Sequence, residues 1–325
     1  MSAVLDSPAR RFSVYGLLAP SGRRGKLLIF IFHRVLARPD PLLPSEPDAA
    51  RFERIVSFVA SNFNVLRLGD AVERLAMGSL PTASACITFD DGYADNFSVA
   101  APILQRHRVP GTFFIATGYI DGGRMWNDEV IEAVRASTGD RIDATDVGLG
   151  EYLWHDAESR VAACERLLKD LKYFEPKRRR EVARELAHRA GLPAEADTMM
   201  TPAQLRALAD AGHELGGHTM THPILATLSD AAAADEIGAG REQLAQWIGR
   251  PVESFAYPNG VPGVDYTVRD VGLVAKAGFR SAVSTRRGVA TARSIIFELP
   301  RFSPWDRSMP KFALRCAQAL ATFNP

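Results

Sequence analysis

The sequence lacks any uninterrupted apolar run of the roughly 18–20 residues that a membrane-spanning helix needs. It is poor in cysteine: Cys86, Cys164 and Cys316 are odd in number and widely spaced, which fits neither a disulfide framework nor a cysteine zinc site. An excess of charge of one sign is also missing, because 39 Lys and Arg stand against 38 Asp and Glu. This balance argues against a nucleic-acid-binding protein.

The N-terminus lacks a clear targeting signal. Arg10 and Arg11 invite comparison with a twin-arginine signal, but the apolar stretch that follows, residues 14–19, is short and stops at Pro20. We therefore expect residues 1–24 to form a loosely ordered arm, with contact to a membrane or a partner as the alternative. The expected location is the cytoplasm or the cytoplasmic face of the membrane. The sequence carries no indication of oligomeric state.

Strand-like and helix-like patterns alternate along most of the chain. Repeated strand–helix units predict parallel strands joined by helical crossovers, and their number favours a closed or partly closed (β/α) barrel over residues 25–325 rather than a doubly wound sheet. We expect strands at residues 26–32, 85–89, 111–116, 213–217, 254–257, 280–283 and 294–299. We expect helices at residues 48–63, 202–211, 230–248, 265–277 and 310–322, and a further helix that follows the strand at 85–89 and continues through His107.

Residues 119–200 interrupt this alternation with a polar, charged and helical stretch. Helices are expected at residues 160–171 and 177–190, and the whole stretch is predicted to be an insertion over or beside the barrel. Its basic run, Lys177–Arg180, is typical of a solvated helix face. Contact of that run with phosphate or anionic lipid is the alternative.

Two short motifs, each just after an apolar run, supply candidate metal ligands. Thr88–Gly92 reads Thr-Phe-Asp-Asp-Gly, and His218–His222 reads His-Thr-Met-Thr-His. Histidines four residues apart would face one ion from a single helical turn. Carboxylate and imidazole ligands suit zinc, with cobalt or nickel as alternatives, and three protein ligands leave room for water and substrate. The predicted metal ligands are Asp91, His218 and His222.

Asp90, beside the first of these ligands, is the candidate general base. Its alternative is a turn residue that caps the following helix, because Asp-Asp-Gly is common in turns. His33, Asp90, Asp91, His218 and Tyr257 each follow an expected strand. The carboxyl ends of barrel strands carry the chemistry in such folds, so this shared placement groups the five residues at one site.

The motifs resemble those of the polysaccharide deacetylases, carbohydrate esterase family 4. The family's first motif is present letter for letter at Thr88–Gly92, and its second, His-(Ser/Thr)-x-x-His, is matched at His218–His222. Residues 255–260 take the place of its third motif, and the resemblance spans residues 27–302. It implies a distorted (β/α) barrel and metal-assisted removal of N-acetyl groups from amino-sugar polymers. By matching positions, it assigns the base to Asp90 and the metal to Asp91, His218 and His222.

The sequence departs from this family at two catalytic positions. Ala256 stands where the third motif usually carries an arginine that orients the base, and we predict that Arg301 replaces it; a surface ion pair is the alternative. No histidine follows His222 to serve as the usual C-terminal general acid. An exopolysaccharide-associated branch places this histidine near the N-terminus in a Tyr/Phe-His-Arg motif, so Phe32-His33-Arg34 assigns the acid to His33.

The remaining site residues are predicted to contact substrate. Tyr257, Pro258 and Asn259 are expected to line the pocket, and backbone N–H groups after Pro258 are candidates for stabilising the oxyanion. Trp126 would stack on a sugar ring beside Asn127, with packing under the insertion as the alternative. His213 is interpreted as structural.

These observations predict a metal-dependent hydrolase that removes N-acetyl groups from amino sugars of an exopolysaccharide or envelope glycan. One alternative is a deformylase or deacylase of a lipid-linked sugar, which the basic run of the insertion would suit. The other is a non-catalytic glycan-binding module on the same fold. The expected partner is therefore an N-acetylated glycan or a lipid-linked sugar, with peripheral membrane contact left open.

Overall fold

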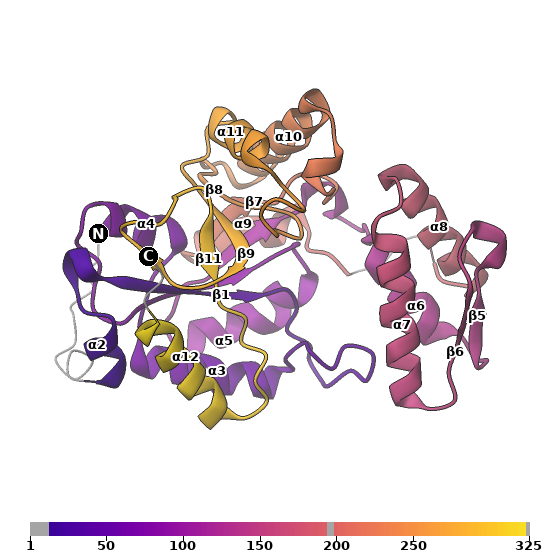
Figure 1. The fold of residues 1–325 in the computed structure, drawn as a ribbon, viewed down its shortest axis with the longest axis horizontal. Helices are drawn as coiled ribbons and strands as arrows, with labels where there is room; N and C mark the ends of the chain where they lie inside the picture. Colours follow the sequence, from indigo (N-terminus) through magenta and orange to yellow (C-terminus); the bar gives the residue numbers. More distant parts are fainter. Residues whose placement is uncertain (1–12, 194–197, 323–325) are drawn as a thin grey trace.

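A single parallel sheet organises the protein, for which the computed structural model describes residues 13–193 and 198–322 (Figure 1). The sheet order is β10-β1-β3-β4-β7-β8-β9-β11, with β2 also paired to β3, and among the described strands of this sheet only the β1–β10 pair is antiparallel. The strands are β1 (Lys26–Phe32), β2 (Asn64–Val65), β3 (Ser84–Phe89), β4 (Thr112–Ile115), β7 (Glu214–Gly217), β8 (Ser254–Ala256), β9 (Ser281–Arg287), β10 (Ala290–Thr291) and β11 (Leu299–Arg301).

The sheet closes between its first and last long strands. The backbone N–H of Phe302, just after β11, donates to Ile29 O at 2.7 Å, and Ile31 N–H donates to Phe302 O at 3.1 Å. Phe302 thus pairs in parallel with Phe30 of β1. This closure confirms the predicted distorted (β/α) barrel and brings the ends of β1, β3 and β11 together.

Amphipathic helices surround the barrel. In α3, the Asp48 side chain accepts from Arg51 N at 2.7 Å, and Phe52, Ile55 and Val59 are buried along one face, as predicted. Each such buried apolar side chain stabilises the fold by about 1.5–3 kcal/mol. The helices around the sheet are α3 (Ala49–Asn62), α4 (Leu68–Ala76), α5 (Ala101–Arg106), α9 (Pro202–Asp210), α10 (Asp230–Ile248), α11 (Val268–Lys276) and α12 (Met309–Ala321). In the described part of the chain, no helix has the length and apolar character to cross a bilayer.

The part of the expected N-terminal arm that the structure describes is packed against the body. Helix α2 (Val14–Leu18) buries Tyr15, whose hydroxyl donates to Ala313 O of α12 at 3.1 Å. The prediction of a loose arm is therefore wrong for residues 13–24. The Arg10-Arg11 pair lies outside the described residues.

The insertion forms a separate lobe beside the barrel (Figure 1). It contains α6 (Trp126–Ala136), the hairpin β5 (Arg141–Asp143) and β6 (Glu151–Leu153), α7 (Ala157–Lys172) and α8 (Pro176–Arg189). Both predicted helices are present, whereas the hairpin was not predicted. The lobe has its own apolar cluster, which includes Val130, Val134, Tyr152, Leu167, Leu171, Val182 and Leu186.

One predicted strand is wrong. Residues 294–298 form a turn rather than a strand: Ser294 N–H donates to Thr291 O at 2.9 Å and Glu298 N–H donates to Ile295 O at 2.9 Å. Ile295 and Ile296 are exposed, so their apolar character does not reflect burial in the sheet. The strand that closes the barrel begins only at Leu299.

Candidate active site

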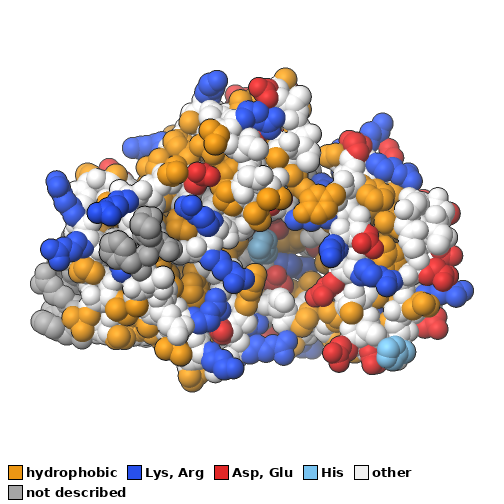
Figure 2. All heavy atoms as spheres, in the orientation of Figure 1, with side chains coloured by type: hydrophobic (Ala, Val, Ile, Leu, Met, Phe, Trp, Pro, Cys, Tyr) orange, Lys and Arg blue, Asp and Glu red, His pale blue; other side chains and the backbone are white. Residues whose placement is uncertain are grey.

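Most of the predicted site residues meet at the carboxyl ends of the barrel strands. They line a cavity of about 210 Å³ between the barrel and the insertion lobe. Figure 2 shows a hollow between these two parts of the molecule. Pro258 does not line the cavity, and Arg301 lies behind Asp90. The lining residues are His33, Asp90, Asp91, Met125, Trp126, Asn127, His218, His222, Tyr257, Asn259 and Thr285.

Asp91, His218 and His222 form the one cluster of metal-ligating atoms found in the described residues. Asp91 Oδ1 lies 3.3 Å from His218 Nε2 and 3.4 Å from His222 Nε2. His218 Nδ1 lies 2.7 Å from Ala256 O. Because a carbonyl oxygen only accepts, Nδ1 carries the hydrogen and the Nε2 lone pair faces the cluster.

The cluster has the charge distribution of a cation site. Asp91 Oδ1 is buried and accepts no hydrogen bond of good geometry from the described residues. Burial opposes ionisation of Asp91, but the contacts with His218 and His222 hold its pKa below the usual range. Burial lowers the pKa of His222 to about 4, so that imidazole is neutral at neutral pH. One carboxylate and two imidazoles converging on one point fit a divalent metal ion.

The histidine motif is a loop, not the helical turn that its spacing suggested. Thr219 and His222 have left-handed backbones (φ 64° and 52°), and Thr219 Oγ1 accepts from His222 N at 3.1 Å. Glu236 of α10 fixes the loop by accepting from Met220 N at 3.0 Å and Thr221 N at 2.8 Å. These contacts, rather than helical periodicity, place the two imidazoles together, with ring centroids 4.8 Å apart. Left-handed backbone at non-glycine residues concentrates at functional sites.

Asp90 forms a buried ion pair with Arg301. Nη1 and Nη2 of Arg301 donate to Oδ1 and Oδ2 of Asp90, each at 2.7 Å, and Nε donates to Ser284 O at 3.0 Å. Asp90 is 2% exposed and Arg301 is 1% exposed. Burial alone would raise the pKa of Asp90, but the charge and hydrogen bonds of Arg301 lower it below its usual value. Arg301 therefore takes no part in a surface ion pair.

His33 lies just after β1 and projects toward the cavity while its neighbours are fixed. Phe32 stacks on Phe89, and Arg34 forms an ion pair with Asp95 at 2.8 Å. Asn96 Nδ2 donates to the backbone carbonyl of His33 at 2.9 Å. The backbone is thus held on both sides of His33, while the His33 side chain remains exposed.

The expected substrate-contact residues differ in what they offer. The Tyr257 ring stacks on Tyr266 at 3.7 Å between centroids, its hydroxyl is buried without a hydrogen-bond partner among the described residues, and burial raises its pKa. Gly260 N–H donates to Pro258 O at 2.7 Å, so this N–H is not available as an oxyanion donor. Asn259, with φ 58°, lines the cavity.

On the insertion side, Trp126 and Asn127 are the first residues of α6. Trp126 is half-buried: it lines the cavity and also packs against the apolar cluster of the insertion lobe. Both roles considered for this side chain are therefore compatible with its position. Asn127 Nδ2 donates to the Tyr93 hydroxyl at 3.4 Å, and its Oδ1 is buried without a partner in the described part of the chain.

A second cavity of about 250 Å³ adjoins the first, and sequence patterns did not indicate it. The two cavities share His33, Asn259 and Thr285, and the second is also lined by Trp305, which is 59% exposed. The Arg287 guanidinium lies 5.7 Å from the Trp305 ring centroid. The two cavities therefore lie next to each other at His33.

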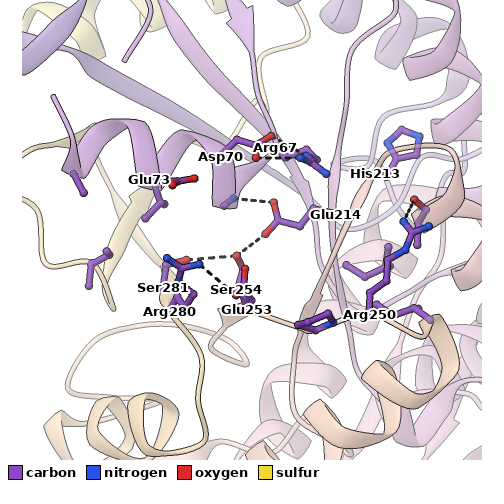
Figure 3. A pocket seen from close by; sticks show the side chains of 18 of the residues that line it. Arg67, Asp70, Glu73, His213, Glu214, Arg250, Glu253, Ser254, Arg280 and Ser281 are labelled. Atoms are coloured by element: carbon purple, nitrogen blue, oxygen red, sulfur yellow. Dashed lines mark hydrogen bonds and ion pairs between the residues drawn. The ribbon is translucent and has the colours of Figure 1, made fainter. Parts of the chain in front are cut away.

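A larger cavity, about 400 Å³, lies at the opposite end of the barrel, around the first residues of β7, β8 and β9 (Figure 3). Glu214 points toward Ser254 there and accepts from Ser254 Oγ at 2.5 Å and Gly69 N at 2.8 Å. His213 Nδ1 accepts from Gly111 N at 3.0 Å, which agrees with its structural interpretation. Several of the polar side chains are paired with one another, such as Glu214 with Ser254 and Arg67 with Asp70, as expected of the stabilising end of a barrel.

Comparison with known proteins identifies the family of the chain. The polysaccharide deacetylase family profile matches residues 78–145 and 165–282, more than half of the chain. The chain therefore belongs to the polysaccharide deacetylase family. His33 and Arg301 lie outside the matched segments. The search of curated proteins found no match.

Several solved structures share the fold. Streptococcus pyogenes deacetylase PplD in complex with acetate has a TM-score of 0.61 at 16% identity, covering 90% of this chain and 98% of its own. IcaB from Ammonifex degensii has a TM-score of 0.59 at 17% identity, covering 93% and 99%. A de-N-acetylase from Aggregatibacter actinomycetemcomitans has a TM-score of 0.58 at 13% identity, covering 89% and 99%. At these identities the likeness establishes the fold.

Proposed function

We propose that this protein is a metal-dependent hydrolase that removes N-acetyl groups from the amino sugars of an exopolysaccharide or envelope glycan. One observation carries the proposal: an unpartnered, buried Asp91 oxygen converges with His218 and His222 beside the buried Asp90–Arg301 pair. The cluster offers one carboxylate and two imidazoles, which favours Zn²⁺, with Co²⁺ or Ni²⁺ as alternatives. Such an ion supplies Lewis acidity toward the acyl oxygen and makes water a stronger nucleophile at neutral pH.

Asp90 is the general base in this proposal. Its lowered pKa keeps it ionised at neutral pH, so it can accept the proton of the attacking water. A carboxylate has about four acceptor sites, so the two hydrogen bonds from Arg301 leave lone pairs free. Arg301 holds the carboxylate in one orientation and acts through it as a positioning residue.

His33 is the general acid. As water oxygen bonds to the acyl carbon and the carbon–nitrogen bond breaks, the departing nitrogen must gain a proton to leave as an amine. His33 is the exposed imidazole among the residues that line the cavity, which also include Trp126 of the insertion. The products are the amine of the sugar and acetate. PplD, the deacetylase of the same fold, is described in complex with acetate.

The two adjoining cavities favour an extended glycan over a single lipid-linked sugar. In this proposal the cavity of about 210 Å³ takes the reacting sugar, and the adjoining cavity, lined by the exposed Trp305 ring, takes a further sugar of the chain. Exposed aromatic rings provide apolar area on which the face of a sugar packs. Tyr257, Asn259, Trp126 and Asn127 are proposed to contact the reacting sugar.

The experiment that tests the function compares wild type with Asp90→Asn on oligomers of N-acetylglucosamine. We expect wild type to release acetate, and Asp90→Asn to release none while it retains one metal ion per chain. A rate unchanged by the substitution removes Asp90 from the mechanism. A non-catalytic glycan-binding module would bind the oligomers equally well with and without metal, and release acetate in neither case.

A further inference from the structure

Arg179 of α8 is a buried arginine without an acidic partner. Arg179 is 4% exposed. In the described part of the chain, no carboxylate lies within ion-pair distance of its guanidinium. By contrast, the arginines on the barrel side of the site are paired: Arg34 with Asp95 and Arg301 with Asp90. A buried charge without a partner is costly, and it is normally compensated by a counter-ion.

The contacts of Arg179 leave part of its donor capacity unused. Nη1 donates to Lys172 O, at the C-terminal end of α7, at 2.7 Å. Nε is buried without an acceptor among the described residues. The carboxylate whose charge acts on Arg179 is that of Glu175, but its oxygens accept from the backbone N–H groups of Lys177 and Arg178. The hydrogen bond to the C-terminal end of α7 therefore occupies Nη1 and leaves the buried Nε without an acceptor.

The guanidinium lies against the wall of the active-site cavity. Its Cζ is 4.8 Å from the ring centroid of Trp126, which lines that cavity. Arg180 follows Arg179 in the chain, is half-buried and lies near Tyr119, whose hydroxyl donates to Thr221 O of the histidine loop at 2.9 Å. Arg179 therefore lies against the cavity wall, and Arg180 lies near a residue that contacts the histidine loop.

We infer that Arg179 and Arg180 form a subsite for an anionic group of the glycan, a carboxylate or a phosphate, next to the sugar that is deacetylated. This inference rests on the proposed function and specifies its substrate class: an N-acetylated glycan that also carries negative charge. The planar guanidinium suits both groups, since it donates paired hydrogen bonds to carboxylate or phosphate oxygens. Figure 2 shows basic side chains at the hollow between the barrel and the insertion.

Equilibrium binding to zinc-loaded Asp90→Asn tests the subsite without turnover. Calorimetry compares two matched pairs of probes. The carboxylate pair is a hyaluronan tetrasaccharide against the neutral N-acetylglucosamine tetramer, and the phosphate pair is N-acetylglucosamine 1-phosphate against N-acetylglucosamine. Each pair is measured in three backgrounds: the parent, the parent with Arg179→Gln, and the parent with Arg184→Gln. Arg184 is the matched control, because it lies on the same helix with a side chain that is 75% exposed.

We expect one anionic probe to bind about 10- to 100-fold more tightly than its neutral mate, the range of one charge-assisted hydrogen bond. The probe that does so identifies the group as carboxylate or phosphate. Arg179→Gln should abolish the preference, Arg184→Gln should preserve it, and added salt should weaken it. If Arg179→Gln does not fold, Arg180→Gln replaces it, with a loss of preference again expected.

The inference is overturned if, in the parent, the affinities for the anionic and the neutral probe are equal in both pairs. It is also overturned if a preference for an anionic probe survives both Arg179→Gln and Arg180→Gln. The two proposals fail separately, because binding is measured without catalysis. If wild type releases no acetate while the anionic preference holds, the deacetylase function falls and the subsite stands. If acetate is released and no preference exists, the subsite alone falls.

Discussion

Arg301 donates one hydrogen bond of 2.7 Å to each carboxylate oxygen of Asp90, although 211 residues separate the two in the sequence. The pair exists because the barrel closes: Phe302, next to Arg301, pairs with β1, and this places the end of β11 near the end of β3. The family's third motif, which carries Ala256 here, has no side chain that could make this contact. The ion pair therefore links closure of the fold to the chemistry of the site.

Arg301→Gln should lower turnover and shift its pH dependence. Without the guanidinium, burial raises the pKa of Asp90, so the base is protonated up to a higher pH and the acidic limb of the kcat/KM profile moves to higher pH. We expect a loss of about 10²–10⁴-fold near neutral pH, measured as acetate release from pH 5 to 9. Arg286→Gln, an exposed substitution in β9, is the control. An unshifted acidic limb contradicts control of Asp90 by Arg301.

His33→Ala should reduce amide hydrolysis about 10²–10⁴-fold, the scale of a positioned general acid. An acetate ester with a phenolate leaving group needs no proton at that step, so its hydrolysis should be largely retained. Parallel kinetics on an N-acetylated oligomer and on p-nitrophenyl acetate separate the two cases. His155→Ala, whose side chain is 84% exposed in the insertion, is the control. Equal losses on both substrates would remove the acid role from His33.

Trp305→Ala should affect long substrates only. The ring lines the adjoining cavity and not the one that holds Asp90 and Asp91, so we expect it to contact a further sugar of the chain rather than the reacting one. We expect KM for an N-acetylglucosamine tetramer to rise about five- to tenfold, the scale of one aromatic contact, with the monomer unaffected. Steady-state kinetics against chain length provide the measurement, and Leu314→Ala on α12 is an exposed apolar control. A uniform change at all lengths contradicts a distal subsite.

His213→Asn should make stability less sensitive to acid. Burial lowers the pKa of His213, whereas the unfolded chain binds this proton near pH 6.5. Below about pH 6.5 the unfolded state therefore binds more protons, and stability falls as the pH falls. Asparagine can keep the hydrogen bond from Gly111 N without titrating. Tm measured between pH 5 and 8 should fall less steeply in this variant than in wild type or in the exposed His188→Asn. Identical slopes contradict this account.

The sequence predicted the parts of the fold and site that depend on local patterns. Residues 26–32 form a strand as their apolar run indicated, and the end of each expected strand located His33, Asp90, Asp91 and His218. Arg301 could be predicted from the sequence because it follows the strand expected at residues 294–299. In addition, Ala256 stands where the third motif usually carries an arginine, so another arginine had to be sought.

Features that depend on distant contacts were missed or misinterpreted. The spacing of His218 and His222 suggested a helix, but Glu236 of α10 holds this segment as a loop. Residues 294–299 are apolar enough for a strand, yet a turn exposes Ile295. Thr285 and Trp305 belong to no local motif, and only the closed barrel brings them beside His33.

The central claim is a metal-dependent deacetylase site at Asp91, His218 and His222. Its most direct test is acetate release from short N-acetylglucosamine oligomers by zinc-loaded protein, chelated protein and Asp91→Ala, with bound metal determined for each. We expect acetate only from the zinc-loaded protein with Asp91 intact, at one metal ion per chain. Equal acetate release from chelated protein or from Asp91→Ala, or no metal and no acetate from wild type, would contradict the claim.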